Sequence, residues 1–196
     1  MPTRFDHAEQ ATIREKLRAA AREAFARKGV ARTTVDELAA AAHIGKGSFY
    51  KFYPTKQLLF FELLEDFQND LRTPLILPSA EDWKPEREEL ILLLTEMFRK
   101  IAGEKLIHIL GDAREFGAII QKVPPERLLD HQTADQQFLD ALIAKWSRSS
   151  PAPERDQIAA QMTLLILLCL RRDFVGERLF PHAARSLIRA LADMFF

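Results

Sequence analysis

The side chains best suited to contacting a nucleic acid gather in residues 46–51. Lys46 and Lys51 supply cations. Ser48 and Tyr50 supply hydroxyl groups between them, and Gly47 has no side chain to hold another backbone away. Ammonium and hydroxyl groups are donors that proteins use on phosphate oxygens and base edges. The pattern therefore predicts a DNA-contacting surface, with a helical hairpin whose lysines are simply solvated as the alternative.

Two short helices joined by a tight turn would position these residues. Thr34 and Glu37 have the spacing of a capping box, which predicts a helix start near Val35. Apolar residues then recur at the spacing of one helical face: Val35, Leu38, Ala39 and Ala42. Residues 43–45 (His-Ile-Gly) break this pattern, and a second short helix is expected over 46–53. This is the arrangement of a helix-turn-helix.

A third helix is expected to start directly after Pro54. Thr55 can cap its first turn, and Lys56 follows at its positive N-terminal end. A helix N-terminus with an adjacent lysine attracts anions. We therefore expect a second phosphate contact here.

An upstream helical pattern completes a longer motif. With it, residues 13–59 closely resemble the TetR family of transcriptional regulators, over about a quarter of the chain. The matching positions are Leu17, Ala20, Ala21, Phe25, Gly29, Thr34, Val35, Leu38, Ala39, Ile44, Lys46, Gly47, Ser48, Phe49, Tyr50, Tyr53, Lys56 and Leu59. The resemblance implies a three-helix DNA-binding domain, followed by a helical domain that binds a ligand and dimerises.

Seven residues are expected at the DNA. Our hypothesis is that four of them read or approach bases: Lys46, Gly47, Ser48 and Lys51. The other three would hold phosphates: Thr34, Tyr50 and Lys56.

Four positions depart from the family pattern inside this region. His43 stands where the family often has Gly, and Tyr53 where it usually has Phe. Gly45 replaces the Ser that commonly caps the recognition helix, which costs only a few tenths of a kcal/mol because Gly is a tolerable N-cap. Phe52 replaces a His that often contacts a phosphate, so a contact through this side chain is in question.

The charges of the chain are unevenly distributed. Its 196 residues carry no formal net charge, and 47% of them are hydrophobic, enough for one substantial core or two modest ones. Residues 1–56 contain 11 Lys plus Arg against 6 Asp plus Glu, whereas the remainder contains 17 against 22. The net charges are therefore +5 and −5, and the basic part is the part with the motif.

Other sequence features are consistent with a cytoplasmic protein. The N-terminus is too polar for a secretory signal, and the longest apolar run, 162–170, is too short to span a membrane. Cys169, the one cysteine, lies inside that run and is expected to be a buried, inert thiol. We therefore predict a cytoplasmic protein with no membrane partner.

The helical period dominates the chain, so we predict an all-α fold of about nine helices. The first runs over about 8–28 and stops at Gly29, a residue suited to a helix C-terminus. The fourth, 56–72, is apolar on most sides and is expected to connect residues 1–56, the DNA-binding domain, to residues 73–196. Prolines bracket a linker at the boundary: Pro74, Pro78 and Pro85. Five further helices are expected over 86–102, 105–121, 126–146, 154–176 and 182–196.

The last two helices are predicted to form a homodimer interface. Residues 162–170 are apolar all around, and the final helix carries an apolar stripe. The resemblance implies dimerisation through these helices as a four-helix bundle. The expected interface residues are Leu165, Leu168, Leu187, Leu191, Met194 and Phe195. Packing within one chain is the alternative.

A small-molecule pocket is predicted among the helices of the second domain. Its expected lining is Met97, Phe98, Ile101, Phe116, Ile120, Phe138, Leu142, Trp146, Met162 and Cys169. Core packing is the alternative for these residues, and the pocket depends on their number and on the resemblance. Glu104, His108 and Asp112 would share one helical face, but a solvated face is commoner than a metal site, so no metal or cofactor is predicted.

Enzymatic function is not expected. The sequence has no Gly-rich phosphate loop, no G-x-S-x-G elbow and no H-E-x-x-H pair. Our hypothesis is a homodimeric repressor that a small molecule releases from its operator by displacing the fourth helix. The alternatives are an architectural DNA-binding protein without an inducer and a helical metal-binding or enzymatic bundle.

Overall fold

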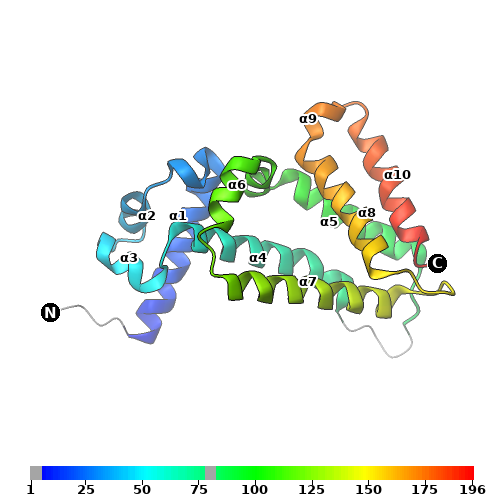
Figure 1. The fold of residues 1–196 in the computed structure, drawn as a ribbon, viewed down its shortest axis with the longest axis horizontal. Coiled ribbons are helices and arrows are strands. Elements are labelled where there is room, and N and C mark those ends of the chain that lie inside the picture. The colour runs from blue at the N-terminus through cyan, green and yellow to red at the C-terminus, as the bar shows by residue number, and fades with distance from the viewer. Residues whose placement is uncertain (1–5, 78–82) are drawn as a thin grey trace. The chain divides into compact units, whose positions relative to one another are not determined.

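The computed structural model describes residues 6–77 and 83–196 and confirms the all-α prediction. Its described part contains ten α-helices and one 3₁₀-helix, in the order seen in Figure 1, and no strand. The two segments beyond the predicted nine arise because the helices expected over 105–121 and 154–176 are each divided in two. Pro78, in the predicted linker, lies outside the described residues.

The chain forms two compact units. The N-terminal unit comprises residues 1–66 and 108–124, and the C-terminal unit comprises residues 67–107 and 125–196. The helix α4 (Lys56–Ile76) runs through the boundary between them. A segment from the middle of the sequence, 108–124, belongs to the same unit as the helix-turn-helix.

The N-terminal unit is built on α1 (His7–Arg32), α2 (Val35–Ala41) and α3 (Lys46–Phe52), with α6 (Ala113–Ile120) added from the middle of the chain. Its core is apolar and includes Leu17, Phe25, Leu38, Phe49, Leu59 and Phe60. The sequence pattern of α2 largely agrees with this packing, since three of the four residues expected on its inner face, Leu38, Ala39 and Ala42, are buried, whereas Val35 is partly exposed.

Two unusual backbone positions shape the turns of this unit. Gly29 has φ 81° and ψ 167°, which interrupts α1 and leaves a short final turn over residues 30–32. His43, in the turn between α2 and α3, has φ 58°. That value lies in the left-handed region, which favours glycine but which His enters more readily than most residues. The turn therefore keeps its shape with a histidine in this position.

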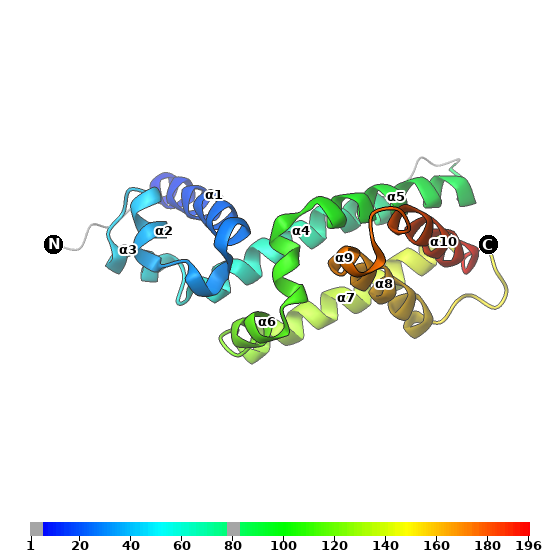
Figure 2. The same cartoon turned by 90° about the horizontal axis from the view of Figure 1, so that it is seen from above.

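The C-terminal unit contains α5 (Arg87–Gly103), α7 (Pro125–Trp146), α8 (Arg155–Leu170), α9 (Arg172–Val175), α10 (Phe180–Asp193) and the second half of α4. In Figure 2, α5, α8 and α10 lie side by side. Their facing side chains form the core, including Leu90, Leu94, Phe98, Leu165, Cys169, Ile188 and Leu191. Trp146 at the end of α7 is fully buried and donates its indole N–H to the carbonyl of Leu75 at 2.8 Å.

The end of α4 differs from the prediction. The helix continues through Pro74 to Ile76 and does not stop at Arg72. A proline costs one backbone hydrogen bond, but in the last turn tertiary contacts can hold the chain in place. Leu75 is fully buried and its carbonyl accepts from Trp146, which supplies such contacts.

The segment after α5 also differs from the prediction. Residues Lys105–Gly111 form a 3₁₀-helix, and α6 starts anew because the Asp112 carboxylate accepts the N–H groups of Arg114 and Glu115, both at 3.0 Å. Glu104, His108 and Asp112 therefore do not share one α-helical face. Within the described residues, no group of three or more potential metal ligands is found. Likewise, no helix there is both long and apolar enough to cross a membrane.

Candidate nucleic-acid interface

The start of α2 is fixed by the predicted capping box. The Glu37 N–H donates to Thr34 Oγ1 at 3.2 Å, and the Thr34 N–H donates to Glu37 Oε2 at 2.9 Å. Lys28 Nζ of α1 adds a bond to Glu37 Oε1 at 2.6 Å. The bond from Lys28, followed by those from Thr34, lowers the pKa of Glu37 from 4.5 to about 2. The carboxylate thus stays charged and orders the entry to the helix-turn-helix.

The helix α3 has one face in the core and one in solvent. Phe49 and Phe52 are buried against the unit, whereas Lys46, Tyr50 and Lys51 are exposed. The Tyr50 ring stands edge-on to Phe49 at a centroid distance of 5.5 Å, which orients an otherwise half-exposed phenol. The predicted DNA-contacting residues of α3 are therefore presented together by a helix whose other side is anchored.

Gly47 lies on this solvent side. A Cβ atom added at Gly47 would meet no other atom within 4 Å. The interior of the protein therefore does not require glycine here. A surface that something else approaches closely would require it.

Lys46 is paired in the free protein. Its Nζ lies 2.8 Å from Asp36 Oδ2 of α2, and this bond raises the pKa of Lys46. Both side chains are more than half exposed, so the pair is weak and its ammonium can exchange one anion for another.

The start of α4 carries the predicted cap and the predicted lysine. Thr55 caps the helix, since its Oγ1 accepts the Leu58 N–H at 3.1 Å. Lys56, expected to hold a phosphate, donates in the single chain to the carbonyls of Ala31 at 3.0 Å and Thr33 at 2.5 Å. Its ammonium thus closes the turn between α1 and α2, and burial lowers its pKa.

Arg14 of α1 was missed by the sequence reasoning. Its guanidinium carbon lies 5.8 Å from the centroid of the Phe52 ring and 5.5 Å from that of Tyr53. Both distances are typical of cation–π contacts. Arg18, one turn further along α1, is instead paired with Glu62 and Asp66. No carboxylate in the described part of the chain pairs with Arg14, which remains exposed beside the end of α3. The contact joins residues 38 or more positions apart, so no local sequence pattern could indicate it.

The predicted pocket residues are mostly in the core of the C-terminal unit. Seven of them are buried: Met97, Phe98, Ile101, Phe138, Leu142, Trp146 and Cys169. Met162 is partly exposed, and Phe116 and Ile120 belong to the N-terminal unit with α6. Burial raises the pKa of the Cys169 thiol to about 11, and its Sγ lies 3.8 Å from the carbonyl oxygen of Phe98. The thiol is thus buried, as expected.

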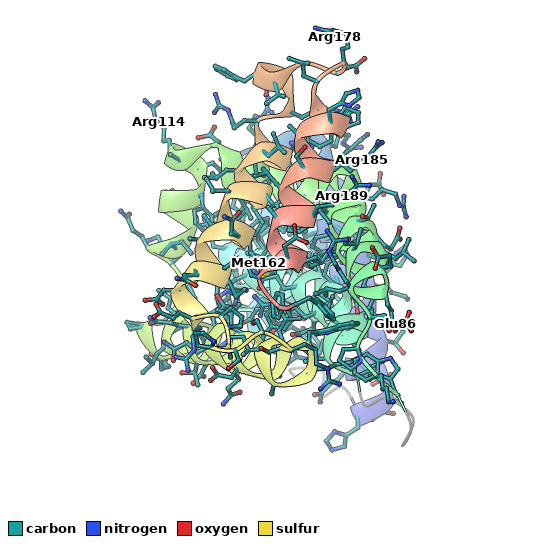
Figure 3. All side chains as sticks on the ribbon, turned by 90° about the vertical axis from the view of Figure 1, so that its right-hand side faces the viewer. Glu86, Arg114, Met162, Arg178, Arg185 and Arg189 are labelled. Carbon is teal, nitrogen blue, oxygen red and sulfur yellow. The ribbon has the colours of Figure 1, made fainter. Side chains whose placement is uncertain are left out.

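The predicted dimerisation residues differ in their exposure in the single chain. Leu165, Leu191 and Phe195 have no exposed surface in the single chain, so they cannot contact a partner without rearrangement. Leu168, Leu187 and Met194 are partly exposed. The apolar residues that α8 presents to solvent are neighbours of the expected ones, Leu164 at 51% exposure and Leu167 at 50%. On α10 the outward side chains include Arg185 and Arg189 (Figure 3).

Comparisons with known proteins agree with the fold. Residues 17–63, which contain α2 and α3, match the family model for bacterial regulatory proteins of the tetR family. A TetR-family transcriptional regulator from Streptomyces coelicolor is similar over 92% of this chain and 81% of its own, with 17% identity and a TM-score of 0.62. A TetR transcriptional regulator from Rhodococcus sp. RHA1 covers 96% of this chain and 97% of its own, with 17% identity and a TM-score of 0.61. RolR, solved in complex with the ligand resorcinol, covers 95% and 96%, with 16% identity and a TM-score of 0.52.

Proposed function

We propose that this chain, a member of the TetR family of bacterial regulatory proteins, is a homodimeric repressor that binds operator DNA through α3 and is released by a small molecule. The observation that carries the proposal is the outer face of α3. Exposed cations and a phenol surround a glycine with open space before it, on a helix whose inner side is packed in a core. That surface lies within the segment that matches the family model.

The proposed DNA contacts are of two kinds, those to bases and those to phosphates. Lys46, Gly47, Ser48 and Lys51 face bases or allow the backbone to approach them, as first expected. Thr34 and Tyr50 hold phosphates through their hydroxyl groups, and Arg14 adds a guanidinium at the end of α3. Lys56 contributes its charge to this surface while its ammonium holds the preceding turn.

Two copies are required for specific binding. A helix-turn-helix reads half-sites about 34 to 36 Å apart, or a multiple of this, when two recognition helices are paired by a dimer. Leu164 and Leu167 form an exposed apolar pair on one side of α8, which a second copy would cover. We place the dimer interface there, with Leu168 and Leu187 at its partly exposed margin.

The ligand would bind in the C-terminal unit. The apolar side chains of α5, α7 and α8 that gather there are suited to a small hydrophobic molecule. The resorcinol complex of RolR, which shares the fold, supports such a site. Because α4 is one continuous helix from the reading surface into the C-terminal unit, its displacement would change DNA affinity by a coupling of about 1–3 kcal/mol.

The proposal is tested with Lys46→Ala combined with Tyr50→Ala. Fluorescence anisotropy would measure the affinity of both proteins for the duplex that the wild type selects from a random library. We expect the double variant to bind at least about tenfold more weakly, because a base contact and a phosphate contact are lost. Arg27→Ala, which removes an exposed cation at the other end of α1, is the matched control and should bind as the wild type does. Wild-type affinity in the double variant would show that α3 does not form the interface.

A further inference from the structure

The turn between α1 and α2 joins four helices of the N-terminal unit. It begins at Gly29, where α1 is interrupted, and ends at Thr34, which caps α2. Thr33 is fully buried between them and donates its hydroxyl to the Gly29 carbonyl at 2.8 Å. The start of α4 reaches the same turn through Lys56, and α6 reaches it through Glu115.

Glu115 occupies the space that Gly29 leaves open. A Cβ atom at Gly29 would lie 2.7 Å from Glu115 Oε1 and 2.9 Å from Oε2, closer than real Cβ contacts. The positive φ of Gly29 favours glycine here, and the absence of a Cβ lets the Glu115 carboxylate take its present position without shifting.

The same carboxylate holds the backbone of the turn. Glu115 Oε1 accepts the N–H of Ala31 at 2.8 Å, while the carbonyl of Ala31 accepts from Lys56 Nζ at 3.0 Å. Residue 31 is therefore held from both sides by charged groups, an anion from α6 and a cation from α4. Hydrogen bonds to charged groups are stronger than those between neutral groups.

The segment that carries Glu115 is connected at both ends to the C-terminal unit. The segment 108–124 leaves the C-terminal unit, packs on the turn through α6 and then returns to the C-terminal unit. Both ends of α6 are thus tied by the chain to the unit in which a ligand is proposed to bind. A movement of α6 would withdraw Glu115 from residue 31.

We propose that Glu115 is a positioning residue for DNA binding. By accepting the Ala31 N–H, it holds the turn between α1 and α2 in one conformation and thereby fixes the orientation of α2 and α3 relative to α1. This rests on the proposed function. Withdrawal of the carboxylate frees the Ala31 N–H, loosens the turn that carries Thr34, and lowers the affinity for DNA.

The test compares Glu115→Ala, Glu115→Gln and Arg114→Ala in the full chain. Hydrogen exchange would follow the Ala31 amide, and anisotropy would follow binding to the duplex that the wild type selects. Gln keeps an oxygen that can accept the Ala31 N–H, so it should rescue most of the loss. Arg114 is the matched control, because it adjoins Glu115 but points away from the unit (Figure 3).

We expect Glu115→Ala to speed exchange at Ala31 by about tenfold or more and to weaken DNA binding about fivefold or more. Wild-type exchange in Glu115→Ala would overturn the contact itself. Faster exchange with unchanged DNA affinity would overturn only the positioning role. A wild-type protein that selects no duplex would overturn the proposed function and the positioning role with it. In that case hydrogen exchange at Ala31 would still test whether Glu115 accepts the Ala31 N–H.

Discussion

At the scale of single residues, a substitution at Gly47 should affect protein stability and DNA affinity differently. Gly47→Ala adds a methyl group that meets nothing within 4 Å in the free protein, and Ala favours a helix by up to about 1 kcal/mol. We expect an unchanged or higher unfolding temperature by circular dichroism and a loss of DNA affinity of about tenfold or more, because the methyl group blocks close approach of the duplex.

Gly103→Ala is the matched control for this prediction. Gly103 ends α5 in the C-terminal unit, and a Cβ there also meets open space. This variant should keep wild-type DNA affinity. Undiminished binding by Gly47→Ala would place the DNA on another surface.

Arg14 provides a second prediction at this scale. Replacement by Met keeps the apolar stem on Phe52 and Tyr53 but removes the cation. If Arg14 contacts a phosphate, Arg14→Met should weaken binding to all duplex sequences alike and reduce the slope of log affinity against log salt by about 1. A titration series between low and moderate salt measures both. A slope equal to that of the wild type would leave Arg14 with a packing role only.

At the scale of elements, the capping box of α2 predicts a dependence of stability on pH. The pKa of Glu37 is about 2 in the folded protein against an ordinary value of 4.5. A lowered carboxyl pKa stabilises the fold fully above the ordinary value, and this contribution is lost as pH falls toward the folded value. Between about pH 4.5 and pH 2, the unfolding temperature of Glu37→Gln should therefore fall less than that of the wild type.

Lys28 supplies the check on this explanation. It makes the largest contribution to the lowered pKa of Glu37, so Lys28→Met should flatten the same part of the pH profile. Gln at position 37 can still accept the Thr34 N–H, which keeps the box itself intact at neutral pH. If the unfolding temperatures of the wild type and Glu37→Gln fell in parallel between about pH 4.5 and pH 2, the lowered pKa of Glu37 would not be the cause of the pH dependence.

The elements whose ends are set by local chemistry were predicted well. The box of Thr34 and Glu37, the cap at Thr55 and the break at Gly29 all depend on residues a few positions apart, and all are present in the structure. The end of α4 was predicted wrongly because a tertiary contact decides it, in which Trp146 holds the turn beyond Pro74. The start of α6 was missed although its signal is local, since Asp112 caps a new helix where a single long one was expected.

In the candidate site, too, the features set by local pattern were predictable and those set by long-range contacts were not. The exposure of Lys46, Tyr50 and Lys51 follows from the helical period of α3, so the sequence sufficed for these residues. The engagement of Lys56 with residues 31 and 33, the stacking of Arg14 on Phe52, and the approach of Glu115 to Gly29 each join distant parts of the chain. Such contacts depend on how helices pack, and one sequence carries no local trace of them.

At the scale of the whole molecule, the position of the exposed leucines predicts how two copies associate. Leu164→Glu combined with Leu167→Glu places two charges on the proposed interface without touching the core of the single chain. We expect light scattering to change from a dimeric to a monomeric mass at unchanged helical content, with a large loss of specific DNA affinity because half-sites are then bound singly.

Leu129→Glu is the matched control for the dimer prediction. Leu129 is 63% exposed on α7 and lies outside the proposed interface. This variant should remain dimeric. A dimeric mass for the α8 variant, or a monomeric one for Leu129→Glu, would place the interface elsewhere.

Selection from a random duplex library by the wild-type protein tests the central claim most directly. A dimer that reads DNA through paired α3 helices should enrich an inverted repeat whose half-sites are centred one helical turn, about 10–10.5 base pairs, or a multiple of it apart. Enrichment should be lost with Gly47→Ala. A library that remains random after repeated rounds with the wild type, or that enriches a site unaffected by Gly47→Ala, would contradict DNA recognition by α3.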